Sequence, residues 1–144
     1  MVTYNFKKRF VAAIVAGHKR HTIRGQRKRH ARPGEQLQLQ HGPRMKPVRL
    51  GTATCTHALA ISINLGLGQI KAEGTMMIET PEDLDSFARR DGFADWADMR
   101  AFWRAEHKTV EVFDGVLMAW DYATFKPADP VAQPTSAKAK GKTA

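Results

Sequence analysis

The segment between Asn5 and Gly17 predicts the first helix of the chain. Asn5 suits a helix N-cap, and Gly17 suits the residue that follows a helix C-terminus. Between them, apolar residues recur at helical spacing at Phe6, Phe10, Ala13 and Ile14. We therefore expect a short helix that packs one apolar stripe on the core.

Strand patterns follow. Pro33-Gly34 predicts a turn, and Leu37 and Leu39 then alternate with glutamines, as in a half-buried strand. Residues 48–65 are rich in β-branched side chains and predict one long bent strand or two shorter ones, with Gly51 as a possible bulge. Residues 74–79 suggest another strand, and residues 112–125 suggest a final one with a glycine-containing turn near its start.

Two further helices are expected in the second half of the chain. Thr80, with Asp83 three residues later and Pro81 between them, predicts a helix start, and this helix should end near Arg90. Another helix is predicted over residues 95–107, with Trp96, Met99 and Trp103 along one face. Short strands with inserted helices and no regular βαβ alternation indicate an α+β domain built round a curled sheet or small barrel.

Charge is distributed unevenly along the chain. The formal net charge is +9, yet residues 1–49 hold 13 Lys and Arg against one acid, whereas residues 50–125 hold 6 against 12. A basic half of this kind is typical of proteins that bind polyanions, because clustered cations release counterions from phosphates. A solvated basic surface that maintains solubility is the alternative.

Length and composition indicate one monomeric domain over residues 1–125, followed by a basic tail over 126–144. The tail is rich in Pro, Ala, Lys and Thr and is expected to be disordered. The single Cys55 excludes an internal disulfide and is consistent with a reducing cytoplasm. No apolar run approaches the roughly 18 residues of a membrane span, so no membrane partner is expected.

Three patterns allow a functional interpretation but favour a structural one. His18 and His21 have metal-like spacing, but they lie among cations that would repel a metal, so no metal is expected. Gly66-x-Gly68 begins like a dinucleotide fingerprint but lacks the third glycine and the following helix, which favours a hairpin loop. Four aromatic side chains that could stack on bases fit the core better: Trp96, Phe102, Trp103 and Trp120.

Lys19 and Thr22 form a candidate nucleophilic pair. A threonine hydroxyl attacks only when a base removes its proton, and a lysine serves as that base only when its pKa is lowered. Five cations close in sequence are expected to lower the pKa of Lys19, namely Arg20, Arg24, Arg27, Lys28 and Arg29. Alternatively, Lys19 binds phosphate and Thr22 bonds a backbone group.

These residues belong to a recognisable block. The pattern F-x3-I-x2-G-x-K-x2-T-I-R, beginning at Phe10, is followed by PGE-x-L-x-L at 33–39 and DGF at 91–93. The combination resembles the ASCH family of the PUA-like superfamily over residues 4–122, and most resembles the ASCH proteins of bacteriophages and prophages. The resemblance implies a small β-barrel of five to six strands with flanking helices and a positively charged cleft for RNA or nucleosides.

The resemblance also implies residue roles. One bacterial branch of the family hydrolyses N4-acetylcytidine without a cofactor, using a lysine base, a threonine nucleophile and a glutamate proton donor. Here these roles fall on Lys19, Thr22 and Asp91, where Asp91 is one methylene shorter than glutamate. Substrate contacts fall on three arginines of the basic segment: Arg24, Arg27 and Arg29. The expected function is thus an amidohydrolase of N4-acylated cytidine, free or in RNA; a noncatalytic RNA-binding module or a ribonuclease is the alternative.

Overall fold

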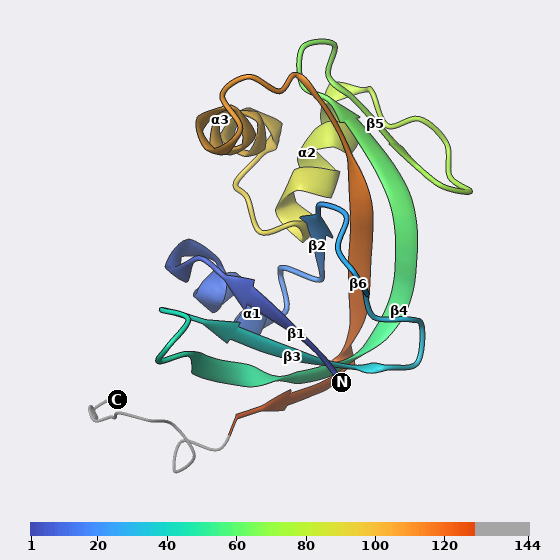
Figure 1. Ribbon diagram of the computed structural model, residues 1–144. Helices are drawn as coiled ribbons and strands as arrows, with labels where there is room; N and C mark the ends of the chain where they lie inside the picture. The colour runs from blue at the N-terminus through green and yellow to red at the C-terminus, as the bar shows by residue number, and fades with distance from the viewer. Residues whose placement is uncertain (129–144) are drawn as a thin grey trace.

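The computed structural model describes residues 1–128. Six strands and three helices make up this part of the chain (Figure 1). In chain order they are β1 (Val2–Phe6), a 3-10 turn (Lys8–Phe10), α1 (Val11–Ala16), β2 (His21–Arg24), β3 (Gln36–His41), β4 (Val48–Asn64), β5 (Gln69–Ala72), α2 (Pro81–Arg90), α3 (Trp96–Glu106) and β6 (Val112–Pro127). The predicted α+β class is confirmed.

All six strands belong to one curled sheet, with the order β1-β3-β4-β6-β2 and β5 added to β4. The long strands β4 and β6 run side by side through the height of the molecule, and β1 and β3 cross their lower part (Figure 1). Register shifts interrupt the pairing of β4 with β3 and with β6, and such irregularities bend the strands. Among the described residues no backbone ladder joins β1 to β2, so the barrel-like sheet stays open there.

The start of the chain differs from the prediction. Residues Val2, Tyr4 and Phe6 are buried alternately, and they form β1 parallel to β3, with Asn5 inside the strand instead of at a helix cap. Helix α1 begins only at Val11, after the 3-10 turn. The apolar positions fit both periods, and the pairing with β3 decides between them because it satisfies the backbone of residues 2–6. The end of the helix was predicted correctly, since Gly17 adopts the left-handed conformation there.

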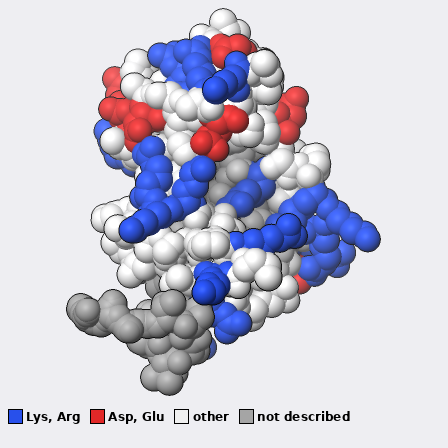
Figure 2. Space-filling view, turned by 60° about the vertical axis from the view of Figure 1, so that its left-hand side comes forward, with Lys and Arg blue, Asp and Glu red and all other residues white. Residues whose placement is uncertain are grey.

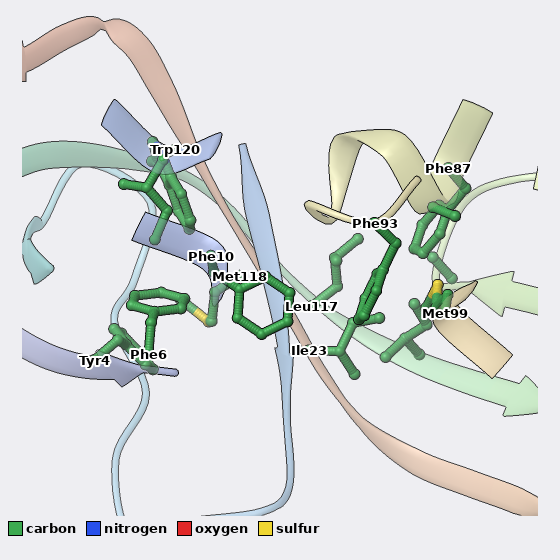
Figure 3. Packing of buried hydrophobic residues seen from close by; sticks show 14 of the residues in the cluster. Tyr4, Phe6, Phe10, Ile23, Phe87, Phe93, Met99, Leu117, Met118 and Trp120 are labelled. Atoms are coloured by element: carbon green, nitrogen blue, oxygen red, sulfur yellow. The ribbon is translucent and has the colours of Figure 1, made fainter. Parts of the chain in front are cut away.

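Helices α2 and α3 cover one side of the upper half of the sheet (Figure 1). Thr80 caps α2, and Asp95 caps α3. The face predicted for α3, with Trp96, Met99 and Trp103, is buried. Figure 3 shows Tyr4, Phe6 and Trp120 in one part of the core and Phe87, Phe93 and Met99 in another, so the two parts pack aromatic side chains from both sheet and helices.

Several smaller expectations are also resolved. Gly66 and Gly68 lie in the tight turn between the antiparallel strands β4 and β5, as the hairpin interpretation predicted. Residues 74–79 do not form a full strand and contribute one bridge, from Ile78 to Ile70. Gly115 lies within β6, paired with Ile61, and not in a turn. Glycine is suited to this position because a Cβ there would stand 2.4 Å from the backbone oxygen of Arg24.

Strand β6 continues to Pro127, two residues beyond the expected domain boundary at 125. Pro127 pairs with Gly51, and the Ala128 amide donates to the Leu50 carbonyl at 3.0 Å. The rest of the predicted tail, residues 129–144, lies outside the described residues. Within residues 1–128, no helix has the length and apolar character needed to cross a membrane.

Candidate functional site

A cavity of about 190 Å³ opens at the gap between β1 and β2, facing α3. Six of its 14 lining residues carry aromatic rings, and two of the tryptophan and phenylalanine residues expected to be core, Phe102 and Trp103, are among them. Polar side chains reach it from four parts of the chain. The lining consists of Asn5, Phe6, Lys7, Phe10, Lys19, Thr22, Ile23, Arg24, Asp91, Phe93, Phe102, Trp103, Glu106 and His107. Thus Lys19, Thr22, Arg24 and Asp91, all predicted from sequence, meet in one cavity.

Lys19 enters the cavity from the connection between α1 and β2. Its backbone amide donates to the Ala13 carbonyl at 3.0 Å, which ties the connection to the end of α1. The side chain is only 3% exposed and its Nζ lies 4.7 Å from the centroid of the Phe10 ring. Gly92 makes this path possible, because a Cβ there would stand 2.9 Å from Cδ of Lys19.

Asp91 is the meeting point of a buried polar cluster that also contains Lys19 and His21. Lys19 Nζ donates to Asp91 Oδ1 at 3.1 Å and to the Asp91 backbone oxygen at 2.5 Å. His21 Nδ1 lies 3.0 Å from the same Oδ1. Asp91 directly follows the last residue of α2, so the Lys19 ammonium also sits at the negative end of that helix.

Burial and charge shift two pKa values in this cluster. Burial lowers the pKa of the Lys19 ammonium, and Arg24 and Arg9 lower it further, against the opposing attraction of Asp91. Burial alone would raise the pKa of Asp91, but the charge of Lys19 and the hydrogen bond from His21 outweigh it and hold the pKa of the carboxyl below its ordinary value. Asp91 is therefore a carboxylate at neutral pH, and Lys19 loses its proton more readily than a surface lysine.

Thr22 and Arg24 lie on β2 on the same face, two residues apart. Arg24 Nε donates to Thr22 Oγ1 at 3.1 Å, and Arg24 Nη2 donates to the Asn5 carbonyl at 2.8 Å, which bridges the gap between β2 and β1. Thr22 is 6% exposed. Within residues 1–128, no hydrogen bond joins Lys19 to Thr22; the hydroxyl is held by Arg24.

The other predicted cations occupy different positions. Arg27 lies 5.1 Å from the Tyr4 ring centroid, and Arg24 lies 5.4 Å from the same centroid, which places Arg27 next to Arg24 but outside the cavity lining. Arg29 pairs with Glu35 on the surface and does not line the cavity. Of the five cations expected to lower the pKa of Lys19, only Arg24 contributes, because burial is the main cause.

Two participants were missed from the sequence. His21 was considered only as a metal ligand, although its place in the block between Lys19 and Thr22 puts it one strand position from the candidate nucleophile Thr22. Arg9 stacks near three phenylalanine rings and pairs with Asp98, at 2.7 Å. No sequence signal connects Arg9 with Lys19, because only the packing of the 3-10 turn in the folded chain brings the charge of Arg9 near Lys19.

The histidines do not assemble into a metal centre. No cluster of three or more His, Cys, Asp or Glu side chains able to hold a metal ion occurs in the part of the chain that the structure describes. His21 faces Asp91, and His30 Nδ1 lies 2.8 Å from the Tyr4 hydroxyl. These contacts give both rings structural partners.

Surface charge follows the same division as the sequence. Figure 2 shows Lys and Arg side chains gathered over the middle of one face, while most acidic side chains lie toward the end that carries α2 and α3. At the cavity, Lys7 and Glu106 approach to 3.5 Å and are both solvent-exposed. The cavity thus lies between a basic and an acidic part of the molecule.

Comparison with known proteins identifies a fold. No family model matches the sequence, and no curated protein matches it either. Among solved structures, ASCH from Zymomonas mobilis is similar at a TM-score of 0.51 and 14% identity, over 87% of this chain and 70% of that one. A tyrosine-to-phenylalanine variant of the same protein is similar at a TM-score of 0.50 and 15% identity, over 88% and 73%. The chain therefore has the fold of an ASCH protein.

Proposed function

We propose that this chain is an ASCH-family amidohydrolase that removes the acyl group from N4-acylated cytidine, as a nucleoside or within RNA. One observation carries the proposal: a buried lysine of lowered pKa shares a cavity with a threonine, a carboxylate and an arginine that come from separate parts of the chain. This set contains a base, a nucleophile, a proton carrier and a cation for a developing oxyanion.

The first half of the reaction forms an ester on Thr22. Neutral Lys19 turns from Asp91 and takes the hydroxyl proton, and Oγ1 attacks the acyl carbonyl carbon. Arg24 already donates to Oγ1, so its charge stabilises the alkoxide and then the oxyanion of the tetrahedral intermediate. The aromatic walls of the cavity offer surfaces for stacking a pyrimidine ring.

The second half releases both products. The bond between the carbonyl carbon and N4 breaks, and N4 receives the proton that Lys19 took, passed through Asp91, whose Oδ1 lies 3.1 Å from Nζ. This route gives Asp91 its role as proton donor although it rests as a carboxylate. Water then adds to the ester carbon and returns a proton to Oγ1, which frees the carboxylic acid and restores Thr22.

The test is incubation of the purified full chain with N4-acetylcytidine, followed by chromatography of cytidine and acetate. Thr22→Ala and Lys19→Ala should each abolish turnover, and the double variant should be scarcely worse, since parts of one nucleophilic unit are non-additive. Thr22→Ser should keep part of the activity because it retains the hydroxyl. Thr3→Ala and Lys28→Ala, which alter exposed residues outside the cavity, are the matched controls. Equal turnover by Thr22→Ala would refute the mechanism.

A noncatalytic RNA-binding role is the second candidate. The cations gathered on the face shown in Figure 2 support it, because they form a surface suited to phosphates. In that case the parent protein shows no hydrolysis, and Lys19→Ala weakens RNA binding modestly while Thr22→Ala leaves it nearly unchanged.

A further inference from the structure

His21 is the one member of the buried polar cluster that does not line the cavity. Its side chain is 9% exposed and its ring packs against Phe87 of α2, with centroids 4.8 Å apart. Its Nδ1 lies 3.0 Å from Asp91 Oδ1, the same oxygen that accepts from Lys19. His21 therefore contacts Asp91 on the side that faces away from the cavity.

The two ring nitrogens of His21 have different surroundings. Nδ1 faces a carboxylate, which can only accept a hydrogen bond. Nε2 is buried and has no hydrogen-bond partner among the described residues. A proton on Nε2 would be an unsatisfied buried donor, so the arrangement favours the tautomer with its proton on Nδ1.

This hydrogen bond competes with Lys19 for one oxygen atom. Groups facing Lys19 are the Asp91 carboxylate, Arg24 from β2 and Arg9 from the 3-10 turn, together with the Phe6 and Phe10 rings. Only Asp91 favours the charged lysine among the three ionised groups. Whatever reduces the negative charge on Oδ1 therefore weakens the hold of Asp91 on the Lys19 proton.

We propose that His21 is a positioning residue that, through its Nδ1 hydrogen bond, orients the Asp91 carboxylate and limits the strength of its pairing with Lys19. The inference rests on the proposed function for its catalytic consequence, although the cluster itself can be measured without any reaction. When the bond is removed, Asp91 Oδ1 accepts only from Lys19, so the carboxylate should hold the Lys19 proton more strongly. The base would then become available only at higher pH.

The direct test is titration of Lys19 in the full chain labelled with ¹³C at the lysine Cε positions, followed by NMR. Lys19→Met identifies the resonance. His21→Phe keeps a ring against Phe87 and removes the donor, and it should move the Lys19 titration to higher pH. His21→Asn places an amide donor near the Nδ1 position and should restore the parent midpoint. His57→Phe changes an exposed histidine of β4 and should have no effect.

Activity provides a separate readout. At a pH on the acid limb of the profile, His21→Phe should lower kcat about tenfold, equivalent to about 1.4 kcal/mol, and shift the limb to higher pH. A merely structural role would lower stability without moving this limb. An unchanged Lys19 titration in His21→Phe, or no restoration by His21→Asn, overturns the proposal. If the parent does not hydrolyse N4-acetylcytidine, the proposed function fails while the titration still decides the role of His21.

A measurement on the parent protein covers the case in which His21→Phe does not fold. ¹⁵N NMR of the imidazole should show the His21 proton on Nδ1, with a downfield proton shift typical of a bond to a carboxylate, and Asp91→Asn should reduce that shift. A proton on Nε2 in the parent would overturn the proposal.

Discussion

The Asp91→Asn variant should have a stability that rises steeply with pH because of Lys19. The substitution removes the negative charge and leaves the Lys19 ammonium buried, at 3% exposure, beside two arginines. Loss of one partner from a buried ion pair costs about 3–5 kcal/mol. The folded variant avoids part of this cost by releasing the Lys19 proton.

The size of the effect follows from the ordinary lysine pKa of 10.5. Neutralising such a group costs about 1.4 kcal/mol for each pH unit below that value, which is about 5 kcal/mol at pH 7 and about 2 kcal/mol at pH 9. The unfolded chain keeps the proton at both pH values, whereas the folded variant releases it once neutralisation costs less than the lost ion pair. Since the unfolded state then binds more protons, stability rises with pH, by up to about 3 kcal/mol over this interval.

Urea denaturation at pH 7, 8 and 9 measures this dependence. The control is Lys19→Met/Asp91→Asn, which shares every other titrating group, so the difference between the two variants isolates Lys19. The single variant should approach the double variant in stability as pH rises. A difference that stays constant from pH 7 to pH 9 would show that Lys19 keeps its proton in the folded state, and the assignment of Lys19 as a base would be wrong.

Three other predictions follow from the same geometry. Gly92→Ala should abolish activity and lower stability, because its Cβ would meet Lys19 and Phe10. The control Gly74→Ala also has a positive φ, of 75°, but no neighbour within 4 Å, so it should keep activity and lose only the stability that backbone strain costs. Thermal melts and turnover compare the two variants. Asp91→Glu supplies the extra methylene of the family residue and should retain turnover, and an inactive but folded variant would contradict a proton-carrying role at this position. If the basic face contacts about six phosphates, RNA affinity should fall about 10³-fold between 50 and 200 mM salt, and binding that does not depend on salt in a filter assay would contradict it.

Local sequence patterns predicted correctly those helices and strands whose capping residues and apolar periodicity indicate the same structure. Thr80 caps α2 through its own side chain, and Leu37 and Leu39 alternate on a strand buried on one face. Lys19, Thr22 and Asp91 were located by a motif, which needs only residue identity and spacing. The same local approach misplaced residues 5–10, where it predicted helix from an N-cap at Asn5, although residues 5 and 6 pair with β3 and a 3-10 turn follows.

The sequence by itself determined the α+β class and the basic first half, since these depend on composition and periodicity, and its resemblance to the ASCH family indicated the residues that carry the candidate chemistry. The tertiary structure decided which of those residues meet. Lys19 and Asp91 are 72 positions apart, and only the packing of the α2 terminus against the start of β2 buries them together and makes burial the main cause of the lowered Lys19 pKa. Desolvation depends on what surrounds a group in space. The hydrogen bond from His21 to Asp91 and the effect of the Arg9 charge on Lys19 likewise depend on distances in the folded chain, which the sequence does not give.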